Sequence, residues 1–404
     1  MNRFLRSVLL VAGLLCASGQ APAAAPDALV TKTLRTGNGR VMKLALPRGF
    51  TYSIVAEGFK RPRFFARSPD NRIFLTSLYN LADNTRGAIY ILDGFDPATG
   101  RIKRVIPWKT GLRNPNSVAF MKDAAGKQWI YVALTDVLMR YPYVDGETSP
   151  SGAAQMVARF PDRGMSAANG GWHLTRTVAA GPNGKVYVSV GSSCNACIET
   201  PAEQDRRAVV LEMNPDGSDS RVFARGVRNA VWMQFSGNQL MASNQGADHL
   251  GANAPNDTFY ALRRGTDYGW PHCYVSGTQI KADAKFPRAA GCKGVGTPLG
   301  RFDAHASALG FDLFPAANNR LLANEYLVAL HGSGSTRLGH GYKIVRMSSA
   351  GKPLGDFMTG FLTRGVVSGR PCGILRVAPD TFLFTDDKFG IVYLVRPEVA
   401  SPAH

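Results

Sequence analysis

Two short segments hold side chains whose types suit proton transfer and the stabilisation of negative charge. His173 lies in the run Trp-His-Leu-Thr-Arg-Thr at residues 172–177, and a histidine with an unperturbed pKa of about 6.5 exchanges a proton close to neutral pH. Arg228 and Asn229 are adjacent, and a guanidinium is always charged. On residue type alone, the favoured interpretation of His173 is a hydrogen-bonded histidine at a strand end, and Arg228 also fits a salt-bridged loop arginine.

The elements that must position these residues form a sixfold repeat. In each repeat a β-run follows a turn, and a second apolar strand comes after it. The first strands are 72–76, 129–133, 186–189, 239–243, 326–330 and 382–385; the second are 88–92, 137–141, 209–213, 259–262, 342–346 and 391–395. Because such units cannot bury both faces alone, six of them predict an all-β fold, a six-bladed β-propeller.

The other segments set the expected domain boundaries. Residues 41–398 are predicted to form the propeller, with a loose arm at 26–40 and a C-terminal tail at 399–404. The run from Met42 to Val55 is expected to close the ring by joining the last blade. The stretch from Cys273 to Phe314 is rich in Gly, Pro and Lys and is expected to be an excursion over one face. Propellers carry functional groups on the loops around the central channel.

Residues 1–25 have the order of a secretory signal peptide. Arg3 and Arg6 precede an apolar run at 8–15, and small residues follow at 21–25. The apolar run is too short to span a bilayer. We therefore expect a periplasmic or secreted protein with no stable membrane anchor.

Five of the six cysteines lie beyond this signal. In an oxidising compartment they predict two disulfides and one free thiol, and the economical pairing is Cys194 with Cys197 and Cys273 with Cys292. A Cys-x-x-Cys spacing also occurs in redox and zinc sites, but the chain has no second one. Ile198 stands where a haem-attachment motif needs histidine, so we expect no haem in this chain.

The composition is that of a folded protein with an excess of basic residues. Of the 404 residues 45% are hydrophobic and 19% are charged, and the formal net charge is +18. Nucleic acid is one partner that such an excess suggests. However, Lys and Arg are scattered without a run or a recognition-helix pattern, so we expect no nucleic-acid partner. A basic pocket for a multiply charged small anion suits the sequence better.

The motifs together resemble those of one enzyme family. The segments His-Leu-Thr-Arg-Thr at 173–177, Gly-Pro-Asn-Gly at 181–184 and Arg-Gly-Val-Arg-Asn at 225–229 are similar to those of the soluble PQQ-dependent aldose sugar dehydrogenases. The chain resembles most closely their sorbosone dehydrogenase-like branch, from about residue 50 to 395. This resemblance implies the oxidation of an aldose or sugar-derived aldehyde, with PQQ and Ca²⁺ as cofactors. It also implies an external electron acceptor, a quinone or a cytochrome.

The resemblance implies roles for individual residues. His173 corresponds to the general base, which also contacts PQQ, and Arg228 to the residue that stabilises the quinone oxygen. The further implied PQQ contacts are Asn229, Arg370, Asn116 and, in place of a family lysine, His331 or Arg337. The backbone carbonyl groups of Gly246 and Ala247 match the loop that holds Ca²⁺, a cation that prefers oxygen ligands.

The chain also departs from the family at several positions. Ser192 stands where glucose-oxidising relatives have an aspartate that supports the histidine, and Cys372 falls near a second cofactor arginine. Trp172 stands where glycine is usual, and Leu174 where tryptophan is common. Two other functions therefore stay open. One is a calcium-dependent hydrolase of the lactonase-like propeller class, which needs a ring of Glu, Asp and Asn side chains. The other is a propeller that only binds a ligand or protein.

Overall fold

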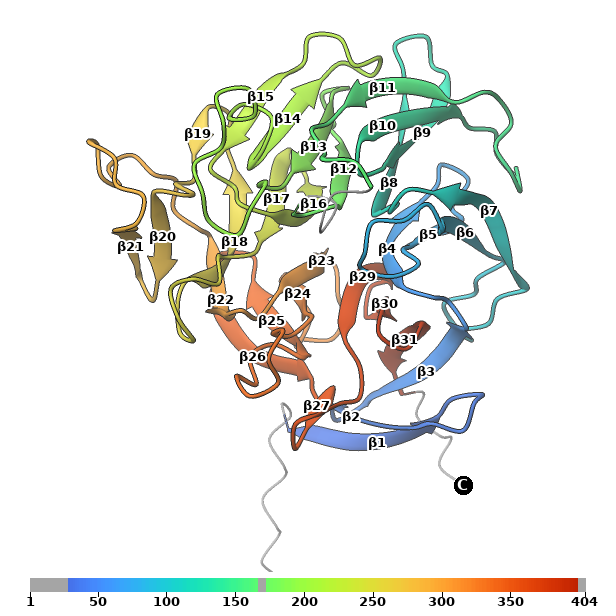
Figure 1. Ribbon diagram of the computed structural model, residues 1–404. Helices are drawn as coiled ribbons and strands as arrows, with labels where there is room; N and C mark the ends of the chain where they lie inside the picture. Colours follow the sequence, from blue (N-terminus) through green and yellow to red (C-terminus); the bar gives the residue numbers. More distant parts are fainter. Residues whose placement is uncertain (1–27, 166–171, 399–404) are drawn as a thin grey trace, which may run out of the picture.

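Six antiparallel sheets are arranged in a ring about a central axis (Figure 1). The computed structural model describes residues 28–165 and 172–398. Within these residues every regular element is a β-strand. The architecture confirms the predicted all-β, six-bladed β-propeller. The predicted signal peptide and the predicted tail at 399–404 lie outside the described residues, and none of the described segments forms a helix able to span a bilayer.

Each blade runs from an inner strand at the axis to an outer strand at the rim. Blade 1 consists of β4 (Pro62–Arg67), β5 (Ile73–Ser77), β6 (Gly87–Asp93) and β7 (Arg104–Leu112). Blade 2 consists of β8 (Ser117–Lys122), β9 (Gln128–Ala133), β10 (Val137–Pro142) and β11 (Gln155–Arg159). Blade 3 consists of β12 (Arg176–Ala180), β13 (Val186–Val190), β14 (Val209–Met213) and β15 (Arg221–Arg225). Blade 4 consists of β16 (Ala230–Ser236), β17 (Gln239–Asn244), β18 (Asn256–Leu262) and β22 (Gly300–Ala304). Blade 5 consists of β23 (Ala308–Phe314), β24 (Glu325–Leu330), β25 (Lys343–Ser348) and β26 (Pro353–Met358). Blade 6 consists of β29 (Pro371–Ala378), β30 (Thr381–Asp386), β31 (Ile391–Pro397) and β3 (Phe50–Glu57).

The strands predicted from the sequence are the two middle strands of every blade. Strand β13, for example, is buried at all five positions, because both faces of a blade pack against its neighbours. The hydrophobic core accordingly lies between adjacent blades. Phe74 and Trp108 of blade 1 pack with Ile130 and Tyr141 of blade 2 in one such cluster.

The ring is closed by β3, the second half of the run from Met42 to Val55 that was expected to close it. Strand β3 pairs antiparallel with β31, so the first and last segments of the propeller share blade 6. Residues 29–35, expected to be part of a loose arm, instead form β1 (Leu29–Arg35), which pairs along its length with β2 (Val41–Pro47). Leu44 and Leu46 of β2 are buried in the same cluster as Phe357, which anchors the hairpin to the propeller.

The predicted excursion is shorter than expected. Residues 300–314 contain β22 and β23, whose apolar residues are buried in blades 4 and 5. The actual insertion lies between β18 and β22. It contains β19 (Thr266–Asp267), which pairs parallel to β15, and the hairpin of β20 (Cys273–Ser276) and β21 (Gln279–Ala282), which lies at the outside of the ring in Figure 1.

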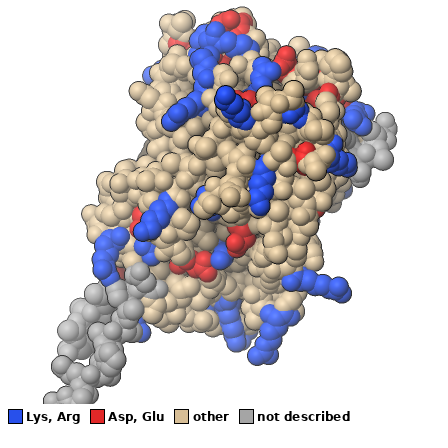
Figure 2. All heavy atoms as spheres, turned by 90° about the vertical axis from the view of Figure 1, so that its left-hand side faces the viewer, with Lys and Arg blue, Asp and Glu red and all other residues tan. Residues whose placement is uncertain are grey.

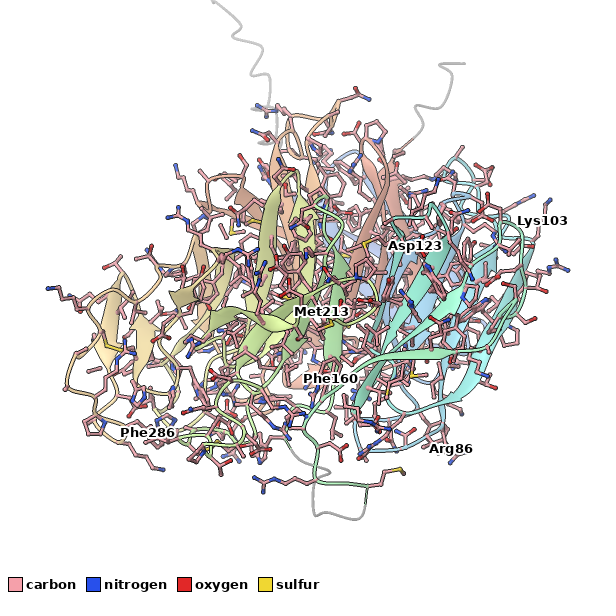
Figure 3. The ribbon with its side chains drawn as sticks, turned by 90° about the horizontal axis from the view of Figure 1, so that it is seen from above. Arg86, Lys103, Asp123, Phe160, Met213 and Phe286 are labelled. Atoms are coloured by element: carbon pink, nitrogen blue, oxygen red, sulfur yellow. A yellow bond between two sulfur atoms is a disulfide. The ribbon has the colours of Figure 1, made fainter. Side chains whose placement is uncertain are left out.

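The inner strands all begin at the same end of the axis, and each contacts the inner strands of both neighbouring blades. The loops that precede inner strands therefore converge at this end. In Figure 3, Arg86 in the loop after β5 and Phe286 in the insertion lie toward one and the same face of the molecule. On the face shown in Figure 2, Lys and Arg are scattered among Asp and Glu without a continuous basic stripe.

Candidate functional site

A cavity of about 640 Å³ opens where the loops of blades 3, 4 and 5 converge. Its wall includes His173 before β12, Arg228 before β16, and Ser307 before β23. The other residues that line it are Trp172, Gln245, Gly246, Asp248, Gly251, Ala252, Asp257, His305, Gly334, Ser335 and Leu338. Its volume is in the range of small-molecule and cofactor sites. The fold thus brings together His173, Arg228 and Gly246, three residues predicted from separate motifs.

His173 is held by the main chain and side chain of one residue. Its Nδ1 lies 2.9 Å from the carbonyl oxygen of Ser192 and 3.1 Å from Ser192 Oγ, whose own hydrogen goes to the carbonyl of Cys194. Because a carbonyl oxygen only accepts hydrogen bonds, Nδ1 carries the ring hydrogen and Nε2 holds a lone pair. Burial and the nearby charge of Arg228 hold the pKa of His173 well below its usual value. The ring is therefore neutral at pH 7 and able to accept a proton at Nε2.

Gly191 lets the histidine and Asn229 approach the backbone closely. A Cβ atom at position 191 would lie 2.6 Å from Cβ of His173 and 2.9 Å from Oδ1 of Asn229. Both distances are shorter than van der Waals contact. Only glycine fits at this position while the two side chains keep their places.

Arg228 is a buried cation held by neutral oxygen atoms. Its Nε donates to the carbonyl oxygen of Asn195 at 2.8 Å, its Nη2 to Asn195 Oδ1 at 2.9 Å, and its Nη1 to the carbonyl oxygen of Gln245 at 3.3 Å. The loop-arginine interpretation requires a salt bridge, but no carboxylate of the described residues forms one with Arg228. Burial lowers the pKa of Arg228 to about 10, so the group stays charged at neutral pH.

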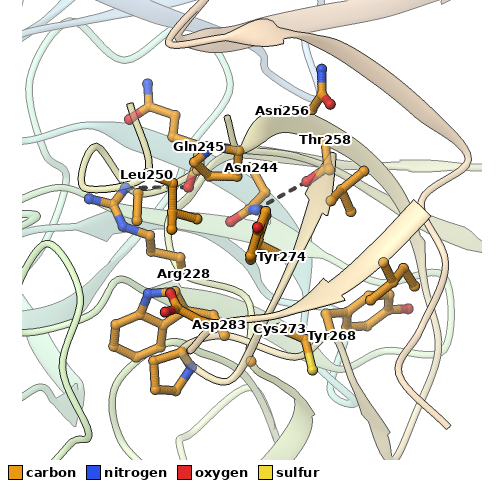
Figure 4. Close-up of a pocket in the computed structure, with 18 of the residues that line it drawn as sticks. Arg228, Asn244, Gln245, Leu250, Asn256, Thr258, Tyr268, Cys273, Tyr274 and Asp283 are labelled. Atoms are coloured by element: carbon orange, nitrogen blue, oxygen red, sulfur yellow. Dashed lines mark hydrogen bonds between the residues drawn. The ribbon is translucent and has the colours of Figure 1, made fainter. Parts of the chain in front are cut away.

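Asn229 follows Arg228 in the chain and connects the start of β16 to the end of β17. Its backbone N–H donates to Asn244 Oδ1 at 2.9 Å, and its Nδ2 donates to Gln245 Oε1 at 3.1 Å. Figure 4 shows Arg228, Asn244 and Gln245 around a second, smaller pocket of about 40 Å³, together with Tyr274 and Asp283 of the insertion. Arg228 thus lines both pockets.

The segment predicted to hold calcium follows β17. The backbone N–H of Gly246 donates to Asp257 Oδ1 at 2.8 Å, and that of Ala308 to Asp257 Oδ2 at 3.2 Å. Burial raises the pKa of Asp257 to about 6. The carbonyl oxygens of Gly246 and Ala247 receive no hydrogen bond from the described residues, so both are free to act as ligands. Within 28–165 and 172–398, no three His, Cys, Asp or Glu side chains are grouped as a metal site.

Besides Asn229, three other predicted cofactor residues lie outside the lining of the main cavity. Asn116 is fully buried and bonds Arg63 and Thr177 across the axis. Arg370 donates to the carbonyl oxygens of Gly332 and Ser333 at 2.8 and 3.1 Å. Arg337 is exposed in the same 331–342 loop, of which Gly334, Ser335 and Leu338 line the cavity. Arg370 therefore supports that wall from behind.

His331, the alternative to Arg337, is part of a charged network at the axis. Its Nε2 lies 2.7 Å from Asp387 Oδ1, and Arg63 forms a salt bridge with the other oxygen of Asp387 at 2.8 Å. These contacts hold the pKa of Asp387 far below its usual value. His331 is therefore paired within the protein.

The predicted cysteine pairing is confirmed. Disulfides join Cys194 to Cys197 and Cys273 to Cys292, and Cys372 is free and buried. Burial raises the pKa of the Cys372 thiol to about 12. This thiol is not among the residues that line the cavity, which favours a buried inert thiol over one within reach of a ligand there.

Several residues of the site were not predicted from the sequence. Asp257 supports the Gly246 segment, and Asn195 holds Arg228. His305 lies 2.9 Å from Asp248 through Nδ1 and 2.8 Å from the carbonyl oxygen of Gly251 through Nε2. No sequence signal pointed to His305, because its segment was assigned to the excursion; in the structure it lies just before the inner strand β23, as His173 lies before β12.

The comparison of sequences gives limited information. No family model matches the chain. A stretch of 223 residues is 29% identical to an uncharacterized protein of Borreliella burgdorferi and covers 53% of this chain. The match spans 57%, little more than half, of that relative's length.

The comparison of structures is more informative. The PQQ domain of pyranose dehydrogenase from Coprinopsis cinerea, in its holo form, is similar with a TM-score of 0.68 at 18% identity, over 88% of this chain and 97% of that one. The chain shares the propeller fold of that PQQ domain. A second such neighbour is the PQQ-bound aldose sugar dehydrogenase of Streptomyces coelicolor, with a TM-score of 0.59 at 19% identity over 88% and 100% of the two chains.

A third neighbour is the calcium structure of a Trichoderma reesei carbohydrate-active enzyme of family AA12. Its TM-score is 0.67 at 16% identity, over 95% of this chain and 100% of that one. At such identities these similarities establish a common fold and leave the chemistry to the residues of the site.

Proposed function

We propose that this protein oxidises an aldose or a sugar-derived aldehyde, with PQQ and Ca²⁺ as cofactors. One observation carries the proposal. A neutral imidazole and a buried guanidinium line the same cavity, and among the described residues nothing bonds Nε2 of the first and no carboxylate contacts the second. The first group accepts a proton and the second stabilises an anion, which are the two tasks of alcohol or aldehyde-hydrate oxidation.

The residues of the cavity fit an anionic, oxygen-rich cofactor. The charge of Arg228 is not neutralised by a contacting carboxylate, and Asn229 and Gln245 stand beside it with amide groups. The free carbonyl oxygens of Gly246 and Ala247 suit the hard cation Ca²⁺. PQQ, when bound, supplies the quinone that takes two electrons from the substrate as a hydride. His173, Arg228 and the 331–342 loop with Arg337 would hold it, and Asn229 and Arg370 would support these residues through Gln245 and the carbonyl groups of Gly332 and Ser333.

The protein's own residues perform the proton and charge steps. His173 Nε2 removes the proton from the hydroxyl group of a hemiacetal or an aldehyde hydrate. Ser192 keeps Nδ1–H in place through its carbonyl oxygen and so sets the direction of Nε2. Arg228 stabilises the negative charge that develops on the ligand during oxidation.

The finer parts of the proposal rest on the sequence. The sorbosone-like substrate follows from the resemblance of the motifs, and the electrons leave for an external quinone or cytochrome. A periplasmic or secreted location agrees with the two disulfides, which persist in oxidising compartments.

Reconstitution tests the proposal. Metal-stripped protein is titrated with PQQ in the presence and absence of Ca²⁺, and dye reduction is followed on a panel of aldoses and aldehydes. We expect saturable, calcium-dependent PQQ binding and sugar-driven reduction of the cofactor. His173→Gln should still bind PQQ but lose about a hundredfold or more in kcat, because a general base contributes about that much.

Two results would contradict the proposal. Absence of PQQ binding with Ca²⁺ in excess would exclude the cofactor. Unchanged dye reduction by His173→Gln would remove the histidine from the mechanism.

A further inference from the structure

A short loop closed by a disulfide contacts both functional side chains. The 192–197 loop follows β13 and is closed by the Cys194–Cys197 bond. At its start, Ser192 orients His173 and donates its own hydroxyl hydrogen to the carbonyl oxygen of Cys194 at 2.7 Å. The position of the imidazole therefore depends on the backbone of this loop.

Asn195, between the two cysteines, holds Arg228 at two points. Its carbonyl oxygen accepts from Nε at 2.8 Å, and its Oδ1 accepts from Nη2 at 2.9 Å. The same Oδ1 accepts the backbone N–H of Asp248 at 2.9 Å. Asn195 thus fixes the guanidinium relative to the loop after β17, and Gln245 holds Nη1 from the other side.

In each of these contacts Asn195 acts as an acceptor. Among the described residues, none receives a hydrogen bond from its Nδ2 group. An aspartate at this position would accept the same hydrogen bonds and would add a negative charge in contact with the guanidinium. Asp248 and Asp257 act on Arg228 through space, but neither forms a salt bridge with it. The chain therefore holds the buried Arg228 cation with a neutral asparagine, although an aspartate would place its acceptor atoms in the same positions.

We propose that Asn195 is a positioning residue that fixes the Arg228 guanidinium with neutral acceptors and leaves its charge available to an anionic ligand in the cavity. The 192–197 loop also ties this cation to His173 through Ser192, so one loop sets the distance between both functional groups. The identity of the anion as PQQ rests on the proposed function. The electrostatic role of Asn195 does not.

Two substitutions separate this role from a purely structural one. Asn195→Ala removes the Oδ1 hydrogen bonds and should lower the melting temperature. Asn195→Asp keeps them and adds an ion pair, so its melting temperature should equal or exceed that of the wild type. If Asn195 only stabilised the loop, the Asp variant would also behave as wild type in every other assay.

PQQ binding is the first functional readout. We expect both variants to bind PQQ in the presence of Ca²⁺ about ten- to a hundredfold more weakly, because a charge-assisted contact with the ligand is weakened. Asn238→Asp is the matched control. It makes the same change of charge at an exposed turn between β16 and β17, at the far end of the propeller from the cavity, and should bind PQQ as wild type does.

The second readout needs no cofactor. The charged groups with the largest effects on the pKa of His173 are Arg228, Arg176 and Arg207, and Arg228 has the largest of the three. Neutralising Arg228 with an aspartate at 195 should therefore raise the pKa of His173, as followed by NMR of protein labelled at histidine and assigned with His173→Gln. A parallel titration of Asn238→Asp should match the wild type.

The outcomes are distinct. A stable Asn195→Asp variant with weaker PQQ binding and a raised His173 pKa supports the proposal. The same variant with wild-type binding and an unchanged His173 pKa overturns it. If wild-type protein binds no PQQ, the proposed function fails, and the histidine titration alone then decides the role of Asn195.

Discussion

The carbonyl oxygen of Ser192 lies 2.9 Å from Nδ1 of His173, so a backbone group orients the candidate base. A serine stands at this position, where the glucose-oxidising enzymes that the motifs resemble have an aspartate that supports the histidine. The backbone carbonyl of residue 192 makes this contact in place of a carboxylate. A neutral carbonyl fixes the tautomer without adding the negative charge that would raise the pKa of the imidazole.

Restoring a carboxylate at position 192 should shift the pH dependence. In Ser192→Asp the new charge opposes the effects of burial and of Arg228 on His173, so the pKa of His173 rises. Because the base must be unprotonated to act, the loss of activity on lowering the pH should begin at a higher pH than in the wild type. We expect the acid limb of kcat/KM against pH to move up by about one unit.

Ser192→Ala is the companion variant. It loses the 3.1 Å contact of Oγ but keeps the carbonyl contact, so its acid limb should not move. A profile of Ser192→Asp that coincides with the wild type would mean that His173 does not control the rate.

Gly191→Ala should displace the base. Its new methyl group would lie 2.6 Å from Cβ of His173 and 2.9 Å from Oδ1 of Asn229, so one of the two side chains must move. A displaced base loses about a hundredfold in kcat, measured by dye reduction under saturating substrate. Asn238→Ala is the control, because this residue is exposed in the turn between β16 and β17, at the far end of the propeller from the cavity. Equal activity of both variants would contradict the crowding argument.

Asp386→Asn should stabilise the protein at neutral and alkaline pH. Burial raises the pKa of Asp386 to about 7, so the folded state favours the protonated form. The free energy of unfolding therefore decreases as the pH rises from about 4 toward 7, because the carboxyl group ionises in the unfolded state before it does so when buried. Oδ2 has no hydrogen-bond partner, and Oδ1 accepts the backbone N–H groups, so an asparagine keeps these bonds.

The effect should depend on pH in a defined way. We expect Asp386→Asn to gain up to about 4 kcal/mol in the free energy of unfolding at pH 8 and almost nothing at pH 4. Denaturant titrations at both pH values measure this difference. A gain of equal size at pH 4 would show that the charge is not its source.

Cys372 should be unreactive in the folded protein. The thiol is buried and its pKa is raised to about 12, so almost no thiolate forms at pH 8. Protein without residues 1–25 should show no thiol reactive to Ellman's reagent when native, and one after denaturation. A native protein in which Cys372 reacts rapidly would mean that the axis opens in solution.

The sequence predicted the middle strands of each blade and not most of the inner and outer strands. Middle strands such as β13 are buried on both faces, which makes them continuous apolar runs that are visible locally. Outer strands such as β11 are largely exposed and carry no such pattern. The 300–314 stretch was assigned to an excursion because its composition gave no sign that β22 and β23 are blade strands.

The sequence by itself determined the fold class, the disulfide pairing and the two motifs around His173 and Arg228, because each depends on residues close together in the chain. Only the tertiary structure decided which of the predicted contacts share one cavity. It placed His173, Arg228 and Gly246 together and turned Arg370 and Asn116 toward other protein groups. It also revealed Asn195 and Asp257 as their supports. The reason is physical: a propeller brings together loop ends that are tens of residues apart, and hydrogen bonds between them leave no pattern in the local sequence.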